Sequence, residues 1–344
     1  MNEESKNSKR FGGGYSAGLD LVRFVAISTV VASHFFLNTG FKQVPFEGVS
    51  MFIQGMGQTL FAVNVALFMM LTGYLNLKKE VSSAYYRTGW RVMLSYLLIS
   101  LLTIAFRVLY LGETKSALGW GMKVTGFSAI PYAWYIEMWI GLFLLTPFLN
   151  VLWRNLTSRR HRQVLIATLF LLTAPADLLN RYGLTLAPAY WEKACYPLMF
   201  FFVGAYIKEY QPQVKRRWLL GAALMICLIN PMVTLLAGGG HTYIQISGDT
   251  NGLFIAPLAV MVFLLLYRTD VRSGALRRVL RKVSVLSLDM YLFSWMFDAL
   301  YYPLFKGAYY ETQGQFGAFF FVLVPLVLLS SLLAAWVKER VIRI

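Results

Sequence analysis

Residues 18–38 read GLDLVRFVAISTVVASHFFLN, an apolar stretch that carries Arg23 and His34 within it. About 20 apolar residues are enough for a helix to cross a bilayer, so this stretch is expected to be a membrane span. At roughly 100° per residue, Arg23 and His34 fall on one helix face, about 16 Å apart along the axis. Asp20 falls on the same face.

A charged guanidinium and a titratable imidazole are costly to hold inside a membrane, and such residues usually face a cavity or a pathway. A plainer interpretation is that Arg23 reaches back to the near interface and that His34 is a hydrogen-bonded core histidine. The stretch by itself leaves both interpretations open.

The composition is typical of a membrane protein. The chain has 344 residues, of which 58% are hydrophobic and 14% are charged, whereas about a quarter of the residues of a soluble domain are charged. Long apolar runs favour an all-α polytopic protein of the plasma or inner membrane over a β-barrel.

We expect no cleavable signal peptide. The two cysteines, Cys195 and Cys227, lie in apolar segments, which predicts neither a disulfide framework nor a metal site.

Ten apolar segments are predicted to span the membrane as helices. They are residues 17–38, 52–75, 90–111, 132–153, 164–180, 193–209, 218–237, 252–268, 284–305 and 316–337. Residues 1–16 are predicted to be a flexible cytoplasmic tail, residues 17–337 a single transmembrane domain, and residues 338–344 a cytoplasmic C-terminal end.

The basic residues indicate the orientation. With a cytoplasmic N-terminus, 24 of the 32 lysines and arginines fall in inside segments and six fall in outside segments, the bias expected of a multi-pass protein. The six are Lys42, Lys115, Lys123, Arg181, Lys193 and Lys306. Both termini are therefore predicted to be cytoplasmic. The net charge of +16 lies at the ends of apolar segments and not in a separate basic domain, which argues against a nucleic-acid partner.

Few polar residues within the predicted spans could carry chemistry. They are Arg23, His34, Asn64, Thr72, Arg107, Glu137, Asp289, Ser294 and Asp298. A histidine can exchange a proton near neutral pH, which makes His34 the first candidate. Glu137 and Asp298 lie near the outer ends of their spans. Either could orient His34 or bind an acceptor, or be a buried carboxylate paired with Arg107 or with backbone donors. The sequence has no nucleophile elbow, phosphate-binding loop or metal-ligand pattern.

Four segments resemble the integral membrane acyltransferase family 3. Arg23, ten intervening residues and His34, on a first helix opened by LDLVRFVA, resemble its signature. VNVALFMMLTGYL (63–75), AWYIEMWIGLFLLTPFL (133–149) and SLDMYLFSWMFD (287–298) resemble later family segments in the same order. Thr72 stands where serine is usual. Ser294 stands where many members have histidine, so the role of that second histidine is not carried over.

The resemblance implies a ten-helix acyltransferase. Such an enzyme takes an acyl group, usually acetyl, from cytoplasmic acyl-CoA and delivers it to a hydroxyl of an extracytoplasmic polysaccharide or lipid-linked sugar. His34 would act as general base or as acyl carrier, and Arg23 would hold the donor, with Asp20 orienting its guanidinium. Arg87 and Arg91 would offer phosphate contacts. The residues expected to support the site or bind the acceptor are Thr72, Trp134, Tyr135, Glu137 and Asp298.

The remaining expectations concern partners. Acyl-CoA is a co-substrate, and no cofactor or metal is expected to be permanently bound. Some family members carry a fused C-terminal esterase-like domain, which we do not expect here, so a separate extracytoplasmic transferase is a candidate partner beside membrane lipids.

Two non-enzymatic functions compete with acyl transfer. In the first, a transporter or flippase uses Arg23, His34 and Glu137 as a proton or substrate pathway. In the second, the protein is a structural or assembly subunit of a glycan-export complex. A transporter would more often show internal repeats and broken helices, and neither is evident in the sequence.

The predicted orientation can be tested by labelling single cysteines in intact cells. Cysteine placed at Ser116 or Thr250 should react with an impermeant thiol reagent, whereas cysteine at Ser158 or Ser273 should react only after the cells are opened. The reverse pattern would overturn the orientation, and with it the direction of acyl transfer.

Overall fold

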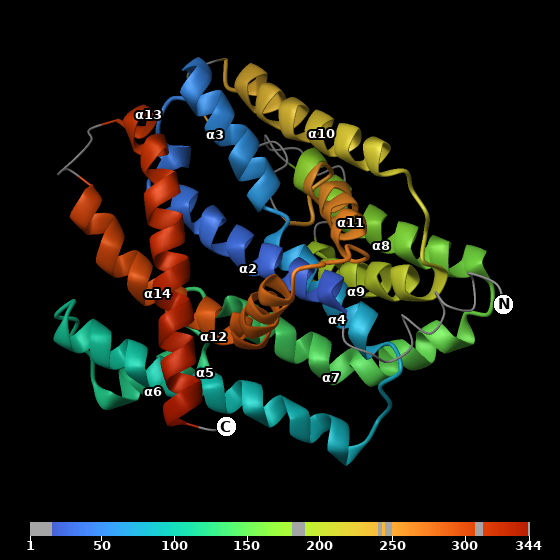
Figure 1. Ribbon diagram of the computed structural model, residues 1–344, viewed down its shortest axis with the longest axis horizontal. Coiled ribbons are helices and arrows are strands. Elements are labelled where there is room, and N and C mark those ends of the chain that lie inside the picture. The colour runs from blue at the N-terminus through green and yellow to red at the C-terminus, as the bar shows by residue number, and fades with distance from the viewer. Residues whose placement is uncertain (1–15, 181–189, 240–242, 245–249, 307–311, 343–344) are drawn as a thin grey trace.

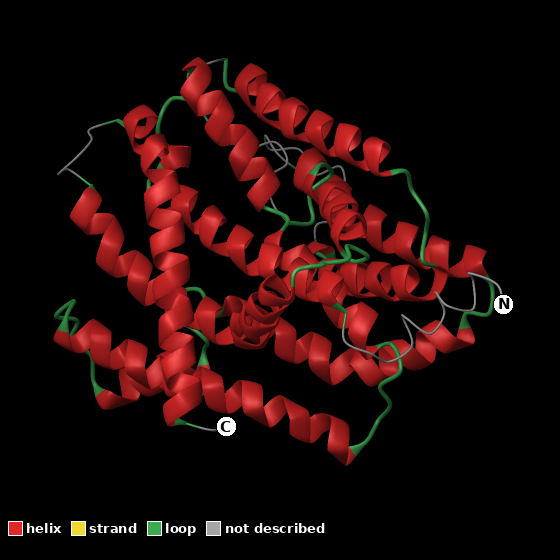
Figure 2. Cartoon of the chain, viewed as in Figure 1, coloured by secondary structure: helices red, strands yellow, loops and turns green. Residues whose placement is uncertain are grey.

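A computed structural model describes residues 16–180, 190–239, 243–244, 250–306 and 312–342. Every regular element in these ranges is helical (Figure 2). The α-helices are α2 (Ala17–Asn38), α3 (Gly48–Phe61), α4 (Asn64–Asn76), α5 (Ser83–Leu109), α6 (Ala117–Thr125), α7 (Trp134–Asn155), α8 (Arg159–Leu179), α9 (Glu192–Tyr210), α10 (Arg216–Ala237), α11 (Ile255–Leu266), α12 (Gly274–Phe305), α13 (Gln313–Phe316) and α14 (Phe320–Val341).

The predicted class, an all-α polytopic membrane protein, is confirmed. Within the described ranges, seven helical stretches are long and apolar enough to cross a membrane. They are Ala17–Gln43, Gly48–Asn76, Ser83–Leu109, Trp134–Asn155, Arg216–Ala237, Gly274–Phe305 and Gln313–Val341. The other three predicted segments coincide with α8, α9 and α11. Helix α11 has 12 residues, and charged residues stand at the ends of α8 and α9. The total of ten spans therefore stays a prediction.

The predicted span 52–75 is a broken helix. Helix α3 ends at Phe61 and α4 begins at Asn64, and the intervening Ala62 and Val63 both have ψ near zero, at −9°. Neither glycine nor proline stands at the break, so nothing in the local sequence signals it. The break places Asn64 in the first turn of α4.

Polar contacts gather the predicted cytoplasmic segments at one end of the bundle. Asn150 of α7 donates to the Lys79 carbonyl at 2.7 Å, and Arg268 donates to the Gln211 side chain at 2.8 Å. Three ion pairs join segments of the same predicted group: Arg154 with Glu80, Arg162 with Glu209, and Lys282 with Glu339. The described segments that these contacts join all belong to the group that the basic residues predict to be cytoplasmic, while the N-terminal tail lies outside the described residues and the side of the membrane stays a prediction.

Helix α2 runs through the centre of the bundle (Figure 1). It packs against α3, α4, α11, α12 and α14. Successive turns of α2 enter three different hydrophobic clusters, with Val22 in the first, Ile27 in the second and Phe35 in the third. A helix with neighbours on several sides presents its polar stripe to protein and not to lipid.

Helices α4 and α9 cross with their backbones in contact. A Cβ atom added to Gly73 would lie 1.9 Å from the Phe201 carbonyl oxygen, and one added to Gly204 would lie 2.0 Å from the Met70 carbonyl oxygen. Small residues at such crossings let membrane helices approach closely. This crossing fixes α4 beside the core and thereby sets the position of Thr72.

Replacing Gly73 with alanine should therefore destabilise the protein. The added methyl group forces α4 and α9 apart, and overpacking of this kind typically costs 1–3 kcal/mol. We expect a lower thermal midpoint and less monodisperse protein in detergent. Gly221→Ala is the matched control, because nothing lies within 4 Å of a Cβ added there. Equal stability of the two variants would contradict the close crossing.

Candidate functional site

A cavity of about 800 Å³ lies between α2, α4, α7 and α12. Arg23 and Asn76 line it at the end predicted to be cytoplasmic, and Gly40, Gln43 and Thr250 line it at the opposite end. At 1.5 Å per helical residue, the α2 part of the lining alone extends about 20 Å. The cavity thus follows α2 through most of the thickness of the bundle.

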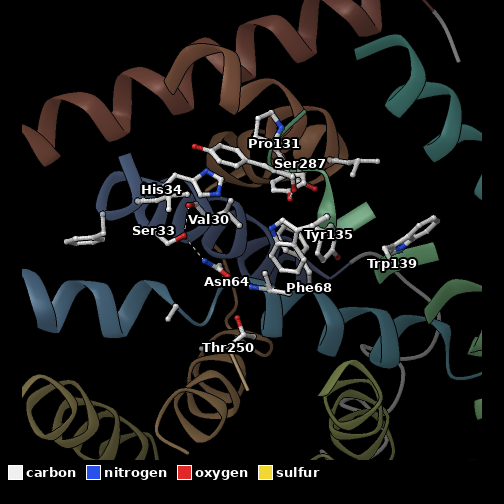
Figure 3. A pocket seen from close by; sticks show the side chains of 18 of the residues that line it. Val30, Ser33, His34, Asn64, Phe68, Pro131, Tyr135, Trp139, Thr250 and Ser287 are labelled. Carbon is white, nitrogen blue, oxygen red and sulfur yellow. Dashed lines mark hydrogen bonds between the residues drawn. The ribbon is translucent and has the colours of Figure 1, made fainter. Parts of the chain in front are cut away.

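His34 faces this cavity and is itself largely buried. Its side chain is 13% exposed, and its ring lies 3.7 Å from the Tyr132 ring, centroid to centroid. Ser33 and Asn64 lie beside it, joined by a hydrogen bond of 2.8 Å from the Asn64 amide to the Ser33 hydroxyl (Figure 3). The break between α3 and α4 is what brings Asn64 to this level.

The carboxylate of Asp298 stands behind the His34 ring. The distance from His34 Nδ1 to Asp298 Oδ2 is 3.6 Å, and the Asp298 side chain is 1% exposed. Tyr132 Oη donates to the same oxygen at 2.9 Å, and Asn38 Nδ2 donates to it at 3.2 Å. Tyr132 is held in turn by Tyr291 of α12, which donates to its carbonyl oxygen. Hydrogen bonds from Tyr132 and Asn38 therefore hold the Asp298 carboxylate in place beside the His34 ring.

This arrangement suits a histidine that takes up a proton from the cavity. Nδ1 is turned toward Asp298, which leaves Nε2 as the nitrogen available to a bound molecule. A carboxylate on Nδ1 sets the tautomer and stabilises the imidazolium that forms when Nε2 is protonated. The 3.6 Å separation is longer than a hydrogen bond, and such contacts often tighten when substrate binds.

Arg23 faces the cavity about three helical turns from His34. Its guanidinium donates to the Ser284 hydroxyl of α12 at 3.0 Å. The predicted partner Asp20 is turned instead to Arg281 of α12, at 3.8 Å, so the predicted Asp20–Arg23 pair does not form. Within the described ranges, no carboxylate lies within ion-pair distance of Arg23. Its remaining N–H groups can therefore serve a bound molecule.

The structure divides the other predicted site residues into two groups. Thr72, Trp134 and Tyr135 line the cavity with Arg23 and His34. Glu137, Arg87 and Arg91 are exposed and do not line it. On sequence grounds Glu137 and Asp298 had the same possible roles. In the structure Asp298 contacts His34 and Glu137 does not, so Asp298 is the carboxylate placed to orient the histidine.

Two charged residues of the predicted spans have structural partners. Arg107 pairs with Glu113 at 2.8 Å, so the pairing of Arg107 with Glu137 or Asp298 considered from the sequence does not occur. The Arg107 guanidinium lowers the pKa of the Glu113 carboxyl from its usual value. Asp289 pairs with Lys338 at 2.9 Å, and Lys338 also donates to the Ser95 hydroxyl at 2.6 Å. Arg107 and Asp289 are therefore held in structural ion pairs away from the His34 cavity.

The sequence places Asn64 among the polar residues that could carry chemistry but gives it no role, and it does not identify Asn38, Tyr132 and Ser33. Asn38 follows His34 by four residues and so shares its helix face, a spacing that could have identified it. Tyr132 precedes α7 and carries no such signal, because its position depends on the path of a loop.

Comparison with known proteins gives one match. The model of the acyltransferase 3 family, described as an acyltransferase domain, matches residues 16–337. The chain belongs to this family. No curated protein and no solved structure matches the chain. The protein is therefore a membrane acyltransferase of the acyltransferase 3 family, with the His34 cavity enclosed by the matched region.

The structure shows what Thr72, Gly73 and Tyr74 contact, in the segment 63–75 that resembles the acyltransferase 3 family. Thr72 lines the cavity, and its hydroxyl donates to the Phe68 carbonyl at 2.9 Å. Gly73 allows the crossing with α9, and Tyr74 is buried against Phe263. The variant residue Ser294 is fully buried, and its hydroxyl donates to the Tyr291 carbonyl at 2.8 Å.

The contact between His34 and Asp298 predicts a selective effect of Asp298→Asn. Asparagine keeps the shape and can still accept from Tyr132, but it cannot stabilise an imidazolium by charge. We expect kcat to fall about 10- to 100-fold, a part of the 10²–10⁴-fold that a general base contributes, with KM little changed. Glu137→Gln, the matched control, should retain wild-type kcat. Loss of activity in Glu137→Gln with a normal Asp298→Asn would reverse the assignment of the two carboxylates.

Proposed function

We propose that this protein is a membrane O-acyltransferase that moves an acyl group, in the first instance acetyl, from cytoplasmic acyl-CoA to a hydroxyl of an extracytoplasmic polysaccharide or lipid-linked sugar. The supporting observation is a single cavity that carries Arg23 toward one end and the His34–Asp298 pair further along α2. On this proposal the protein lies in the plasma or inner membrane, with lipid around the bundle.

The donor would enter from the end that carries Arg23. Acyl-CoA has a long, thin pantetheine arm, comparable in length to the roughly 16 Å between Arg23 and His34. A guanidinium offers several N–H donors in a fixed plane and stays charged when buried. Arg23 is thus suited to hold an oxygen of the arm or of the pyrophosphate while the thioester reaches His34.

His34 would then transfer a proton. Nε2 takes the proton of the acceptor hydroxyl as its oxygen attacks the thioester carbonyl, and the imidazolium returns that proton to the departing CoA sulfur. A covalent route is the other form of the same chemistry: Nε2 attacks the thioester carbonyl and CoA leaves as the thiolate. The acceptor hydroxyl then attacks the acyl carbon, the bond from Nε2 to that carbon breaks, and the hydroxyl proton neutralises the CoA thiolate. Asp298 supports the imidazolium in both routes.

The acceptor would approach from the opposite end. Asn64, Gln43 and Thr250 line that half of the cavity with the rings of Tyr132 and Trp134. Amides, hydroxyls and aromatic faces are groups that can hold a sugar by hydrogen bonds and by its apolar face. The same end could pass the acyl group to a separate extracytoplasmic transferase.

Release of free CoA from acyl-CoA by the purified protein is the direct test. Turnover in nanodiscs would support the proposal, and comparison of surface glycans by mass, with and without the protein, would identify the acceptor. A protein that moves a substrate across vesicles but releases no CoA would instead be a transporter of the kind considered above. The broken helix α3–α4, which the sequence did not reveal, is a feature seen in such proteins.

His34→Ala should abolish turnover while the protein still inserts and folds. Loss of a general base typically costs 10²–10⁴-fold, and loss of an acyl carrier costs at least as much. The control is His161→Ala, because His161 is exposed and lies outside the cavity. Turnover of His34→Ala near the wild-type rate would return His34 to a structural role.

Arg23→Lys separates donor binding from a simple need for positive charge. If Arg23 only reached back to the interface, lysine would replace it. In the cavity, lysine lacks the planar fork that contacts Ser284 and the donor together, and a buried lysine can lose its proton. We expect weaker acyl-CoA binding and most turnover lost, with insertion normal. Arg160→Lys, an exposed change outside the cavity, should have no effect. Wild-type acyl-CoA affinity in Arg23→Lys would remove Arg23 from the donor site.

A further inference from the structure

One face of α12 joins the basic end of the bundle to the cavity. At about 100° per residue, Arg277, Arg281, Ser284, Leu288 and Tyr291 fall within a sector of roughly 80°. Leu288 and Tyr291 line the cavity, and Ser284 accepts the hydrogen bond of Arg23. The arginines therefore continue, toward the predicted cytoplasm, the same face that lines the proposed donor site.

This end of α12 extends beyond the length needed to cross a membrane. The helix has 32 residues, whereas about 20 cross the apolar layer. Its first turns therefore lie at or outside the interface, where Arg277 to Lys282 stand. Arg281 has a side chain that is 55% exposed and lies 3.8 Å from the buried Asp20. Asp20 and Arg23 are one turn apart on α2, so Arg281 stands beside the inner end of the cavity.

A second hollow, of about 390 Å³, lies on these turns. Its lining consists of Arg277, Arg278, Arg281, Lys282, Val285 and Glu339. Arg277 is held by the Asp270 carboxylate at 3.0 Å and by the Val271 carbonyl, and Lys282 pairs with Glu339. The hollow is lined by the side chains of four cationic residues and one acidic residue, so the net charge around it is positive and favours an anion at its rim.

We infer that this basic hollow, through Arg281 above all, binds the phosphate groups on the nucleotide end of acyl-CoA. This inference rests on the proposed function and names the residues that hold the donor outside the membrane. From Arg281 to Tyr291 the helix rises about 15 Å, a length that the pantetheine arm can follow past Ser284 and Arg23. Arg87 and Arg91, expected from the sequence to contact phosphate, lie on α5 and line neither hollow.

Lipid headgroups offer the same phosphate chemistry, since a basic helix end at an interface attracts anionic lipid. A site for the CoA nucleotide and a site for lipid headgroups predict different effects of changing Arg281. A nucleotide site distinguishes donors that carry the 3′-phosphate and pyrophosphate from donors that lack them. A headgroup site distinguishes membranes of different composition and treats all donors alike.

The test compares wild type, Arg281→Gln and Arg272→Gln with three donors: acyl-CoA, acyl-dephospho-CoA and acyl-pantetheine. Arg272 is the matched control, because it is an exposed arginine of the preceding loop that lines neither hollow. For Arg281→Gln we expect KM for acyl-CoA to rise about tenfold, the effect of losing one charge-assisted contact, with kcat unchanged. KM for acyl-pantetheine should stay at the wild-type value, and Arg272→Gln should match wild type with every donor.

Four outcomes would overturn the inference. Equal rises in KM for all three donors would mean that Arg281 acts through Asp20 and Arg23 and contacts no phosphate. A change that appears only when anionic lipid is added to zwitterionic nanodiscs would assign the hollow to headgroups. Unchanged KM in Arg281→Gln would leave it without a donor role. If wild type releases no CoA from any donor, the proposed function fails, and equal CoA affinity of wild type and Arg281→Gln by calorimetry would overturn the phosphate site separately.

Discussion

Arg23 and His34 lie on a helix at the centre of an apolar bundle, where each needs polar neighbours to offset its removal from water. The neighbours come from helices on different sides of α2. Helix α12 gives Ser284 to Arg23 and Asp298 to His34, and the loop before α7 gives Tyr132. The polar face of α2 thus determines which helices surround it and how they are turned. The cavity lies where these polar groups face one another beside apolar side chains of the same helices.

Packing elsewhere in the bundle supports this arrangement. Gly73 lies against the Phe201 carbonyl and Gly204 against the Met70 carbonyl, which brings α4 against α9. Asn64, just after the break at Ala62–Val63, donates to Ser33. The paired charges at the predicted cytoplasmic end, such as Lys338 with Asp289, join α14 to α12. The site is therefore held by contacts that lie well outside it.

Helical periodicity was enough to predict part of the site. It predicted that Arg23 and His34 lie on one face of their helix, and in the structure both side chains line the same cavity. The polar contacts at one end join segments that the distribution of basic residues assigns to one side. Periodicity could not choose between Asp298 and Glu137, because that choice depends on the rotation of α7 and α12 about their axes. It also failed for Asp20, which is turned to α12 and not along its own helix. Tyr132 is placed by a loop, for which no periodic rule exists.

The length of the cavity has an electrical consequence. A passage that reaches from Arg23 to Thr250 spans most of the voltage drop across an energised membrane, and water filling it would conduct ions. Its wall includes the apolar side chains of Val30, Phe68 and Leu71 beside the polar groups. Apolar walls resist wetting, and a fixed positive charge such as that of Arg23 repels cations and protons. Apolar side chains in the lining therefore oppose a continuous column of water between the two ends of the cavity.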